Sequence, residues 1–281
     1  MNKGKPIQRW QDLLTLYASL SAQRDRQWLF RGQRCGCDLA SSLERAVVQR
    51  YKQPHDRMPH WERWLLSEFK RHAHRYLEDL PSDADTLRWY SLMQHHGAPT
   101  RLLDFTYSVY VAVYFAVESA NPGDHCALWA VDANWCWTRA KEKLGSSLRK
   151  RIESDETRGK TPALQAELLA RQIPRVVPDN SFFLDERLAI QQGVFLVPLD
   201  MTKPFMDNLV SDRREAKNHV RRYEIYCSPN FMREALLHLR RMNITSRSLF
   251  PGLDGFARDL QTRISITDLS RVIGVAERGL Y

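Results

Sequence analysis

The sequence predicts an α+β protein, in which helices pack around a mixed, mostly antiparallel sheet. Short apolar runs with strand composition, such as WLFRGQ at 28–33 and CALWAVD at 126–132, stand apart from segments with helical periodicity. The order is helices, a strand, more helices, and then spaced strands with helices between them, which is typical of this class. Eight Trp, ten Tyr and eleven Phe in 281 residues supply a large core, so we expect a folded chain.

The N-terminal half is expected to be mostly helical. Apolar residues repeat at helical spacing over 9–20 and, most clearly, over 61–80. A further helix begins after Asp85, whose side chain suits an N-cap, and ends at Gly97, a natural left-handed cap. Between these helices, the strand at 28–33 is interrupted by Gly32.

The C-terminal half holds most of the predicted strands. TRLLDFT at 100–106 is expected to be a strand, whereas YSVYVAVYFAVE at 107–118 fits either a strand or a buried helix. Two strand-like pieces surround QQG at 191–193, and RYEIYCS at 222–228 is another strand. The charged stretch 139–175 reads as a solvated insertion. The last two helices are predicted after Ser228-Pro229, which caps a helix, and within 244–260.

The charge and the cysteines bear on partners and location. The net charge is +9 and the pI about 9.4, which favours an acidic partner such as nucleic acid or a phosphate-bearing ligand. Five Cys occur without a CxxC or a zinc spacing, and we expect reduced thiols in a cytoplasmic protein without a metal site. No signal peptide is visible, and the longest apolar run, 109–117, is too short to cross a bilayer.

Three polar motifs interrupt the apolar segments. In FRGQ at 30–33, Arg31 is suited to bidentate contacts with phosphate, and Gly32 lets a ligand or a second backbone approach closely. The alternative is that Arg31 pairs with a buried carboxylate and closes the core, and Asp104 is then the expected partner. Alternation along a strand would place Arg101 and Asp104 on opposite faces.

The other two motifs are QHHGAPTRLLDFT at 94–106 and QQG. His95 and His96 are helix neighbours that face different directions and cannot share a metal. Gln191 and Gln192 are expected on opposite faces of a strand, with Glu186 just upstream as a carboxylate. No GxSxG, P-loop, GxGxxG or HExxH motif is present, which removes the usual hydrolase, nucleotide triphosphatase, Rossmann and zinc-protease signals.

Together these motifs resemble the FRG domain family, which is named for its (F/Y)RG motif. The matching segments are FRGQ with SSLER at 41–45, QHHGAPTRLLDFTYSVYVAVYFA at 94–116, RLAIQQGVF at 187–195 and SLFPGLDGFA at 248–257. The resemblance implies an N-terminal helical segment at 1–24, an FRG-type domain at 25–260 with the insertion at about 139–175, and a C-terminal helix or tail at 261–281.

The order of motifs also resembles, more distantly, the split-sheet ADP-ribosyltransferase fold. That resemblance implies NAD as a substrate, with Arg31 holding it and Thr106, or alternatively Thr100, shaping the nicotinamide pocket. A late strand of that fold usually carries Glu, but here Gln191 or Gln192 occupies the position, or Glu186 in a shifted register. A neutral Gln cannot offset a developing cation, so either transfer is weak, Asp104 substitutes, or the protein only binds a nucleotide.

Three hypotheses follow. The first is an NAD-using ADP-ribosyltransferase or NAD glycohydrolase, acting on a protein, a nucleic acid or NAD itself, in a toxin or phage-defence role. The second is a non-catalytic nucleotide- or nucleic-acid-binding module, and the third is a structural domain with a buried polar network. The candidate catalytic residues are Gln192, Gln191, Glu186 and His95, and the candidate binding residues are Arg31, Gly32, Gln33, Thr100, Arg101, Asp104 and Thr106.

Overall fold

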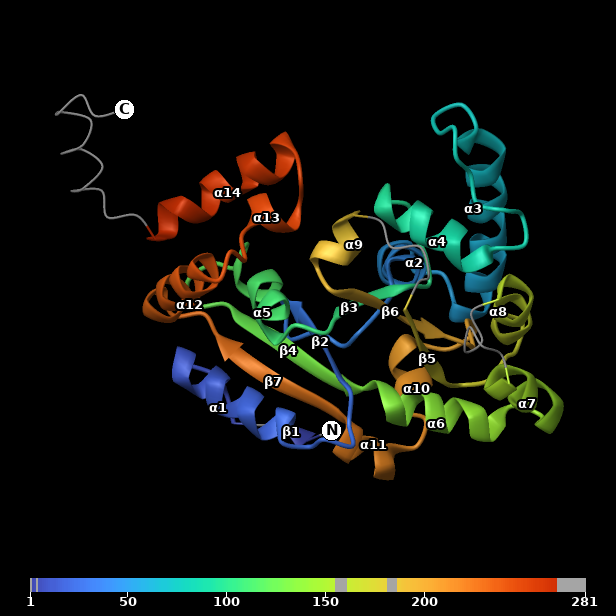
Figure 1. Ribbon diagram of the computed structural model, residues 1–281, viewed down its shortest axis with the longest axis horizontal. Coiled ribbons are helices and arrows are strands. Elements are labelled where there is room, and N and C mark those ends of the chain that lie inside the picture. Colours follow the sequence, from blue (N-terminus) through green and yellow to red (C-terminus); the bar gives the residue numbers. More distant parts are fainter. Residues whose placement is uncertain (1, 4, 155–160, 181–185, 267–281) are drawn as a thin grey trace.

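A computed structural model of the chain describes residues 2–3, 5–154, 161–180 and 186–266, and it confirms the α+β class (Figure 1). In the described part, seven strands form one sheet in the order β1-β7-β4-β2-β3-β6-β5. All neighbours are antiparallel except β1 and β7, which are parallel. The strands are β1 (Asn2–Lys3), β2 (Trp28–Gln33), β3 (Leu103–Thr106), β4 (His125–Asp132), β5 (Val176–Asp179), β6 (Gly193–Pro198) and β7 (Val220–Tyr226).

Helices surround this sheet along the whole described chain. In the first half they are α1 (Trp10–Ser21), α2 (Ser42–Glu44), the π-helical η1 (Arg45–Arg50), the 3-10 turn η2 (His55–Arg57), α3 (Met58–Ala73), α4 (Thr86–His95) and α5 (Val109–Val117). In the second half they are α6 (Ala133–Lys143), α7 (Ser146–Ser154), α8 (Pro162–Leu169), α9 (Glu186–Ile190), α10 (Phe205–Leu209), α11 (Arg213–His219), α12 (Pro229–Arg241), α13 (Ser246–Leu249) and α14 (Leu253–Ile266).

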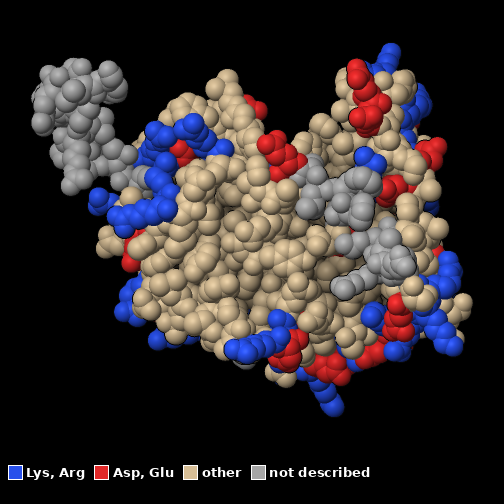
Figure 2. All heavy atoms as spheres, viewed as in Figure 1, with Lys and Arg blue, Asp and Glu red and all other residues tan. Residues whose placement is uncertain are grey.

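The sheet is buried on both faces because alternate residues of its strands point to different helical layers. On β2, Trp28 and Phe30 belong to a core shared with α1, α5 and α12, whereas Leu29 belongs to a core shared with α6, α10 and α11. In the view of Figure 1, the pairs α13–α14 and α3–α4 rise as two arms with α9 between them. The space-filling view in Figure 2 shows a notch between these arms.

The sheet splits between β2 and β3. Only one register pair, Phe30 with Thr106, joins these two strands, whereas six pairs join β2 to β4 and four join β3 to β6. Beyond that pair, the Arg31 side chain connects the two strands: its Nη1 donates to the backbone oxygen of Asp104 at 2.7 Å. On the other side of β2, Gly32 lies against α5 so closely that a Cβ would stand 1.7 Å from the Ala112 oxygen. The glycine therefore serves the approach of a second backbone, one of the two roles predicted for it, and does not end the strand.

The structure resolves one ambiguous segment as a helix and shifts the bounds of one predicted helix. The ambiguous segment 107–118 is helical, because the Ser108 Oγ caps it by accepting from the backbone NH of Val111 at 3.3 Å and nearly every side chain of the helix is buried. The helix predicted over 61–80 is α3, which begins earlier, with Pro59 in its first turn, and ends at Ala73. Its Trp64 is 51% exposed, so the predicted apolar face is only partly covered.

The strand predicted through QQG is wrong. Glu186–Ile190 form α9, the next two residues form a turn, and β6 begins only at Gly193. Gln192 has a φ of 49°, the left-handed conformation that ends a helix. Gln191 and Gln192 therefore do not alternate across a strand. Residues 182–185, which the same prediction included, lie outside the described residues.

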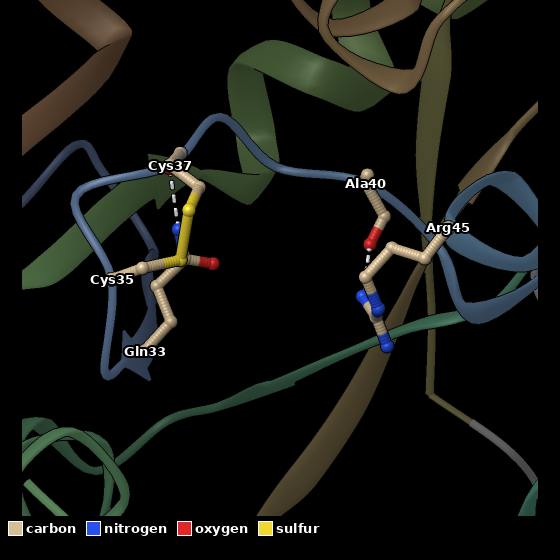
Figure 3. Close-up of a disulfide and its surroundings, with 5 residues drawn as sticks. All are labelled: Gln33, Cys35, Cys37, Ala40 and Arg45. Atoms are coloured by element: carbon tan, nitrogen blue, oxygen red, sulfur yellow. Dashed lines mark hydrogen bonds between the residues drawn. A yellow bond between two sulfur atoms is a disulfide. The ribbon is translucent and has the colours of Figure 1, made fainter. Parts of the chain in front are cut away.

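Arg101 is also not on a strand, because β3 begins at Leu103. Similarly, the expectation of five reduced thiols is wrong for the loop after β2, where Cys35 and Cys37 form a disulfide (Figure 3). The side-chain amide of Gln33 donates to the carbonyl of Cys37 and closes this small loop. Cys126, Cys136 and Cys227 are free and buried.

The ends of the described chain bear on the remaining expectations. Helix α14 crosses the predicted boundary at residue 260, and residues 267–281 of the predicted C-terminal tail lie outside the described residues. Across the ranges that the structure describes, none of the helices has both the length and the apolar character that a bilayer crossing requires.

Candidate functional site

The split between β2 and β3 opens into a hollow of about 220 Å³. Its walls come from β2, β3, α5 and the α9 turn, and they include the predicted residues Arg31, Gly32, Asp104, Thr106 and Gln191. A second hollow of about 100 Å³ is lined by Gln94 and His95 of α4. The two hollows share Asp104, Arg187, Leu188 and Gln191, so they adjoin along one cleft.

Arg31 is the innermost charge of the cleft. Its side chain is 19% exposed, and its Nη1 lies 2.7 Å from the Asp104 carbonyl oxygen and 3.9 Å from the Asp104 carboxylate. Burial lowers the pKa of Arg31 and the neighbouring Arg45 adds to this, while the Asp104 charge opposes it. The Arg31 Nε is buried and has no hydrogen-bond partner in the described structure. The side chain as a whole is partly exposed and lines the larger hollow, so its terminal nitrogens can meet an acceptor that enters the cleft.

Asp104 presents a carboxylate to the same space. Its side chain is 59% exposed, and its Oδ1 accepts from the Gln94 side-chain amide at 2.7 Å. The Gln94 carbonyl oxygen in turn accepts from the hydroxyl of Thr100. Thr100 is fully buried and therefore positions the carboxylate through Gln94 without lining either hollow.

Thr106 and Gln191 form the floor between the strand and the α9 turn. The Thr106 Oγ1 donates to the backbone oxygen of Gln191 at 2.7 Å and accepts from the NH of Ser108 at 3.0 Å. The Gln191 side-chain amide donates to the backbone oxygen of Leu249 at 3.0 Å. Both polar groups thus fix the shape of the cleft as well as line it.

Several predicted residues lie away from the cleft. Gln192 is exposed and lines neither hollow, although its carbonyl accepts from the NH of Tyr107 at 3.0 Å. Glu186 is exposed on α9 and also lines neither, and Gln33 closes the disulfide loop. Arg101 is buried beneath α3, where its Nε donates to Glu62 at 2.6 Å, its Nη2 contacts the second carboxylate oxygen, and its Nη1 donates to the Pro198 carbonyl.

The cleft contains two side chains that sequence reasoning did not select as site residues, Arg187 and Phe115. The Arg187 guanidinium lies 4.6 Å from the ring centre of Phe250 and has no ion pair in the described part of the chain. Phe250 is held by Arg258 at the same distance and packs edge-on against Phe115, which forms the apolar wall of the larger hollow. A cation over an aromatic ring joins residues 63 positions apart (187 to 250), and no local sequence pattern indicates such a pair.

Within the described ranges, no three His, Cys, Asp or Glu side chains lie close enough together to hold a metal ion. His95 and His96 contact each other edge to face, with ring centres 4.9 Å apart. The cleft therefore offers guanidinium, carboxylate, amide and aromatic groups: donors for anionic oxygens, one negative charge, and a flat apolar wall.

The comparisons with known proteins identify part of the chain. Residues 26–125 match the family model of the FRG domain, which takes in FRGQ and QHHGAPTRLLDFT but ends before QQG and SLFPGLDGFA. No curated protein and no solved structure matches the chain. The two motifs that form the core of the cleft, around Arg31 and Asp104, lie within the matched range, so the chain contains an FRG domain over residues 26–125.

Proposed function

We propose that this FRG-domain protein binds NAD in the cleft and cleaves its nicotinamide–ribose bond, either by ADP-ribosyl transfer or by hydrolysis. The observation that carries the proposal is the partly buried Arg31 guanidinium beside the exposed Asp104 carboxylate in a partly apolar hollow. Arginine is suited to diphosphate oxygens because its planar fork donates to two of them at once. Arg187 of α9 lines both hollows and forms no ion pair among the described residues, so it supplies a second guanidinium.

The remaining groups suit the rest of a dinucleotide. The Phe115 ring offers a flat apolar surface for a base or a nicotinamide ring. The two hollows, of about 220 and 100 Å³, are each smaller than a typical small-molecule site of roughly 300 Å³ or more. We therefore expect the reactive half of the ligand, rather than the whole dinucleotide, to fill the enclosed space.

The chemistry needs a negative charge near the ribose C1′. The C1′–N bond breaks, nicotinamide leaves with the bonding electron pair, and positive charge develops on the ribose. Water or an acceptor group then attacks C1′ and gives up a proton. Since Gln191 is neutral and Glu186 lies outside the hollows, the carboxylate that offsets this charge is Asp104 in our proposal. Gln94 holds it in position.

The test compares Arg31→Gln and Asp104→Asn with wild type and with Arg34→Gln. Arg34 is a matched control because it follows the same strand, is 50% exposed and pairs with Asp124 outside the cleft. We expect Arg31→Gln to weaken NAD binding about tenfold or more, the effect of losing charge-assisted hydrogen bonds. Asp104→Asn should keep binding within a few-fold and slow nicotinamide release about 100-fold or more.

Calorimetry measures binding, and chromatography of released nicotinamide measures turnover. Cooperative melting of each variant shows that it is folded. Arg31→Lys keeps the positive charge but not the planar fork of donors. If this variant is folded and still binds NAD weakly, Arg31 has a binding role and not only a folding role. Equal NAD affinity in wild type and Arg31→Gln would refute the proposal. Binding that depends on Arg31 without any turnover, with protein, DNA and RNA offered as acceptors, would instead support the second candidate function, a non-catalytic nucleotide-binding module. That candidate is favoured by the absence of a glutamate from both hollows among the described residues.

A further inference from the structure

Helix α14 carries its polar residues inward and its apolar residues outward. Gly255, Asp259 and Thr262 are the buried residues of its described side chains. The outward face carries Leu253, Phe256, Leu260 and Ile264, which are 79%, 37%, 44% and 81% exposed. An amphipathic helix at a protein surface normally shows the opposite arrangement. We call these four residues the α14 stripe.

The inward face is well satisfied, so the stripe is not the result of loose packing. Asp259 accepts from Arg240 of α12 at 2.6 Å and from Arg263 at 3.0 Å. Arg258 reaches the partly buried Glu118 at 3.6 Å. Gly255 lies so close to the Phe250 carbonyl that a Cβ would stand 1.7 Å from its oxygen. Charges, hydrogen bonds and close backbone packing hold α14 on the molecule, and its apolar face is left for something else.

The geometry of the stripe fits a second helix. Its members are separated by three, four and four residues, the spacing at which side chains line one side of a helix. From Leu253 to Ile264 there are eleven steps of about 1.5 Å each, which give a stripe of roughly 16 Å, about three helical turns. Anchors at this spacing are how amphipathic helices are recognised in grooves and zippers. A bilayer surface suits the stripe less well, because interfacial helices bury a broad apolar face and carry an excess of Lys and Arg, whereas α14 carries two Asp and two Arg among its residues.

The charges beside the stripe select the flanks of the partner. Arg263 is 44% exposed, and the exposed Arg247 of α13 lies over the Phe256 ring at 5.8 Å. Asp254 is the one acidic residue on the outer part of α14. Figure 2 shows basic side chains gathered over this arm of the molecule. A helix with acidic residues on either side of an apolar seam complements this surface.

We propose that the α14 stripe is a docking surface for an acidic amphipathic helix of a partner protein. The position links docking to the cleft. Helix α14 packs against α13, and Phe250, which follows α13, contacts both Arg187 and Phe115 at the cleft. A partner bound along α14 lies beside the cleft mouth and can influence the entry of ligand.

The test uses two fluorescent synthetic helical peptides with the same Leu/Ile seam, one flanked by Glu and the other by Lys. Anisotropy measures their binding to the full chain and to Leu260→Ser and Ile264→Ser, which change exposed residues. Met242→Ser is the matched control, because Met242 is 46% exposed and lies outside the stripe. We expect the Glu peptide to bind wild type and Met242→Ser alike, and each stripe variant about tenfold more weakly, the effect of losing one buried aliphatic side chain. The Lys peptide should bind wild type about tenfold more weakly than the Glu peptide, because of the like charges of the arginines.

Equal binding of both peptides, or an affinity that the stripe variants leave unchanged, would overturn the proposal. So would two other outcomes: a wild-type dimer in sedimentation that Leu260→Ser dissociates, or preferential binding to phosphatidylglycerol vesicles. The readout does not involve NAD, so it succeeds or fails independently of the function proposed for the cleft.

Discussion

The buried ion pair between Arg101 and Glu62 allows a direct test of whether Arg101 stabilises the fold or binds a ligand. Arg101 stands beside Asp104 in the sequence, and the motif predicts a binding role for both. In the structure the side chains of Arg101 and Glu62 are only 8% and 5% exposed. Burial alone would lower the pKa of Arg101, but the charge and hydrogen bonds of Glu62 outweigh it, so the pKa is raised and the guanidinium stays charged. The Tyr90 ring, 5.7 Å from the guanidinium carbon, completes the enclosure.

Removing the charge of Glu62 leaves a buried cation without its partner. For such broken pairs the cost is about 3–5 kcal/mol of unfolding free energy. Because Glu62→Gln keeps one acceptor oxygen, we expect the lower end, about 3 kcal/mol. In a protein of this size, that corresponds to a fall in Tm of about 6–12 °C. A double variant, Glu62→Leu with Arg101→Met, replaces the pair by apolar groups of similar size and should recover most of the loss.

Thermal and urea unfolding followed by circular dichroism measure these changes, and NAD binding is measured well below the Tm of each variant. We expect Glu62→Gln to bind NAD as wild type does, because neither member of the pair lines the cleft. The reasoning is wrong if Glu62→Gln melts within about 2 °C of wild type, a shift too small for a broken buried pair, while NAD binding is lost. Arg101 would then be a binding residue, as its position in the motif predicts.

Two further changes test the packing around the cleft. Gly32→Ala should lower the free energy of unfolding by about 3 kcal/mol or more, because the added Cβ meets the Ala112 carbonyl and must push α5 away. Gly145→Ala is the control: nothing lies within 4 Å of its new Cβ, and it should change stability by less than about 0.5 kcal/mol. Equal denaturation midpoints for the two variants would contradict this prediction. Burial raises the pKa of Glu118 above its ordinary value near 4.5. The folded protein therefore keeps this proton to a higher pH than the unfolded chain does. The stability that the bound proton contributes is lost as pH rises through the raised pKa. The stability of wild type relative to Glu118→Gln should therefore increase as pH falls from 7 towards 4.5, and a difference that stays constant with pH would show that the carboxyl titrates alike in both states.

Local signals were sufficient for much of the fold. The strands at 28–33, 126–132 and 222–228 are confirmed within two residues at each end. Their aromatic and β-branched residues suit a sheet that is covered on both faces. Asp85 caps α4 by accepting from the NH of Arg88, and Gly97 follows it with a φ of 82°. In each case the residue type alone provides the physical reason for the local structure.

The turn at QQG shows why other parts could not be predicted. The five residues before it, ERLAI, are too few for hydrophobic periodicity to distinguish a short helix from a strand. What decides the outcome is distant: the Gln191 carbonyl is fixed by the Thr106 hydroxyl and its amide by the Leu249 carbonyl. Likewise, Glu62 is 39 positions from Arg101, and nothing in either local segment indicates that they pair. Such contacts are tertiary, and tertiary contacts override local preference.

Three arginines that look equivalent in the sequence thus have three different situations, and the difference lies in their acceptors. Arg101 donates to both carboxylate oxygens of Glu62 and to the carbonyl of Pro198, so its hydrogen-bonding capacity is used within the fold. Arg187 has an aromatic ring, which holds the guanidinium in place without using its N–H donors. Arg31 has one backbone oxygen and a buried Nε with no partner in the described structure. Its partly exposed side chain lines the larger hollow, and in our proposal its terminal nitrogens bind the acceptor oxygens of the ligand. Position within a motif thus does not decide which arginine lines the cleft; the acceptors that the fold places around each guanidinium decide it.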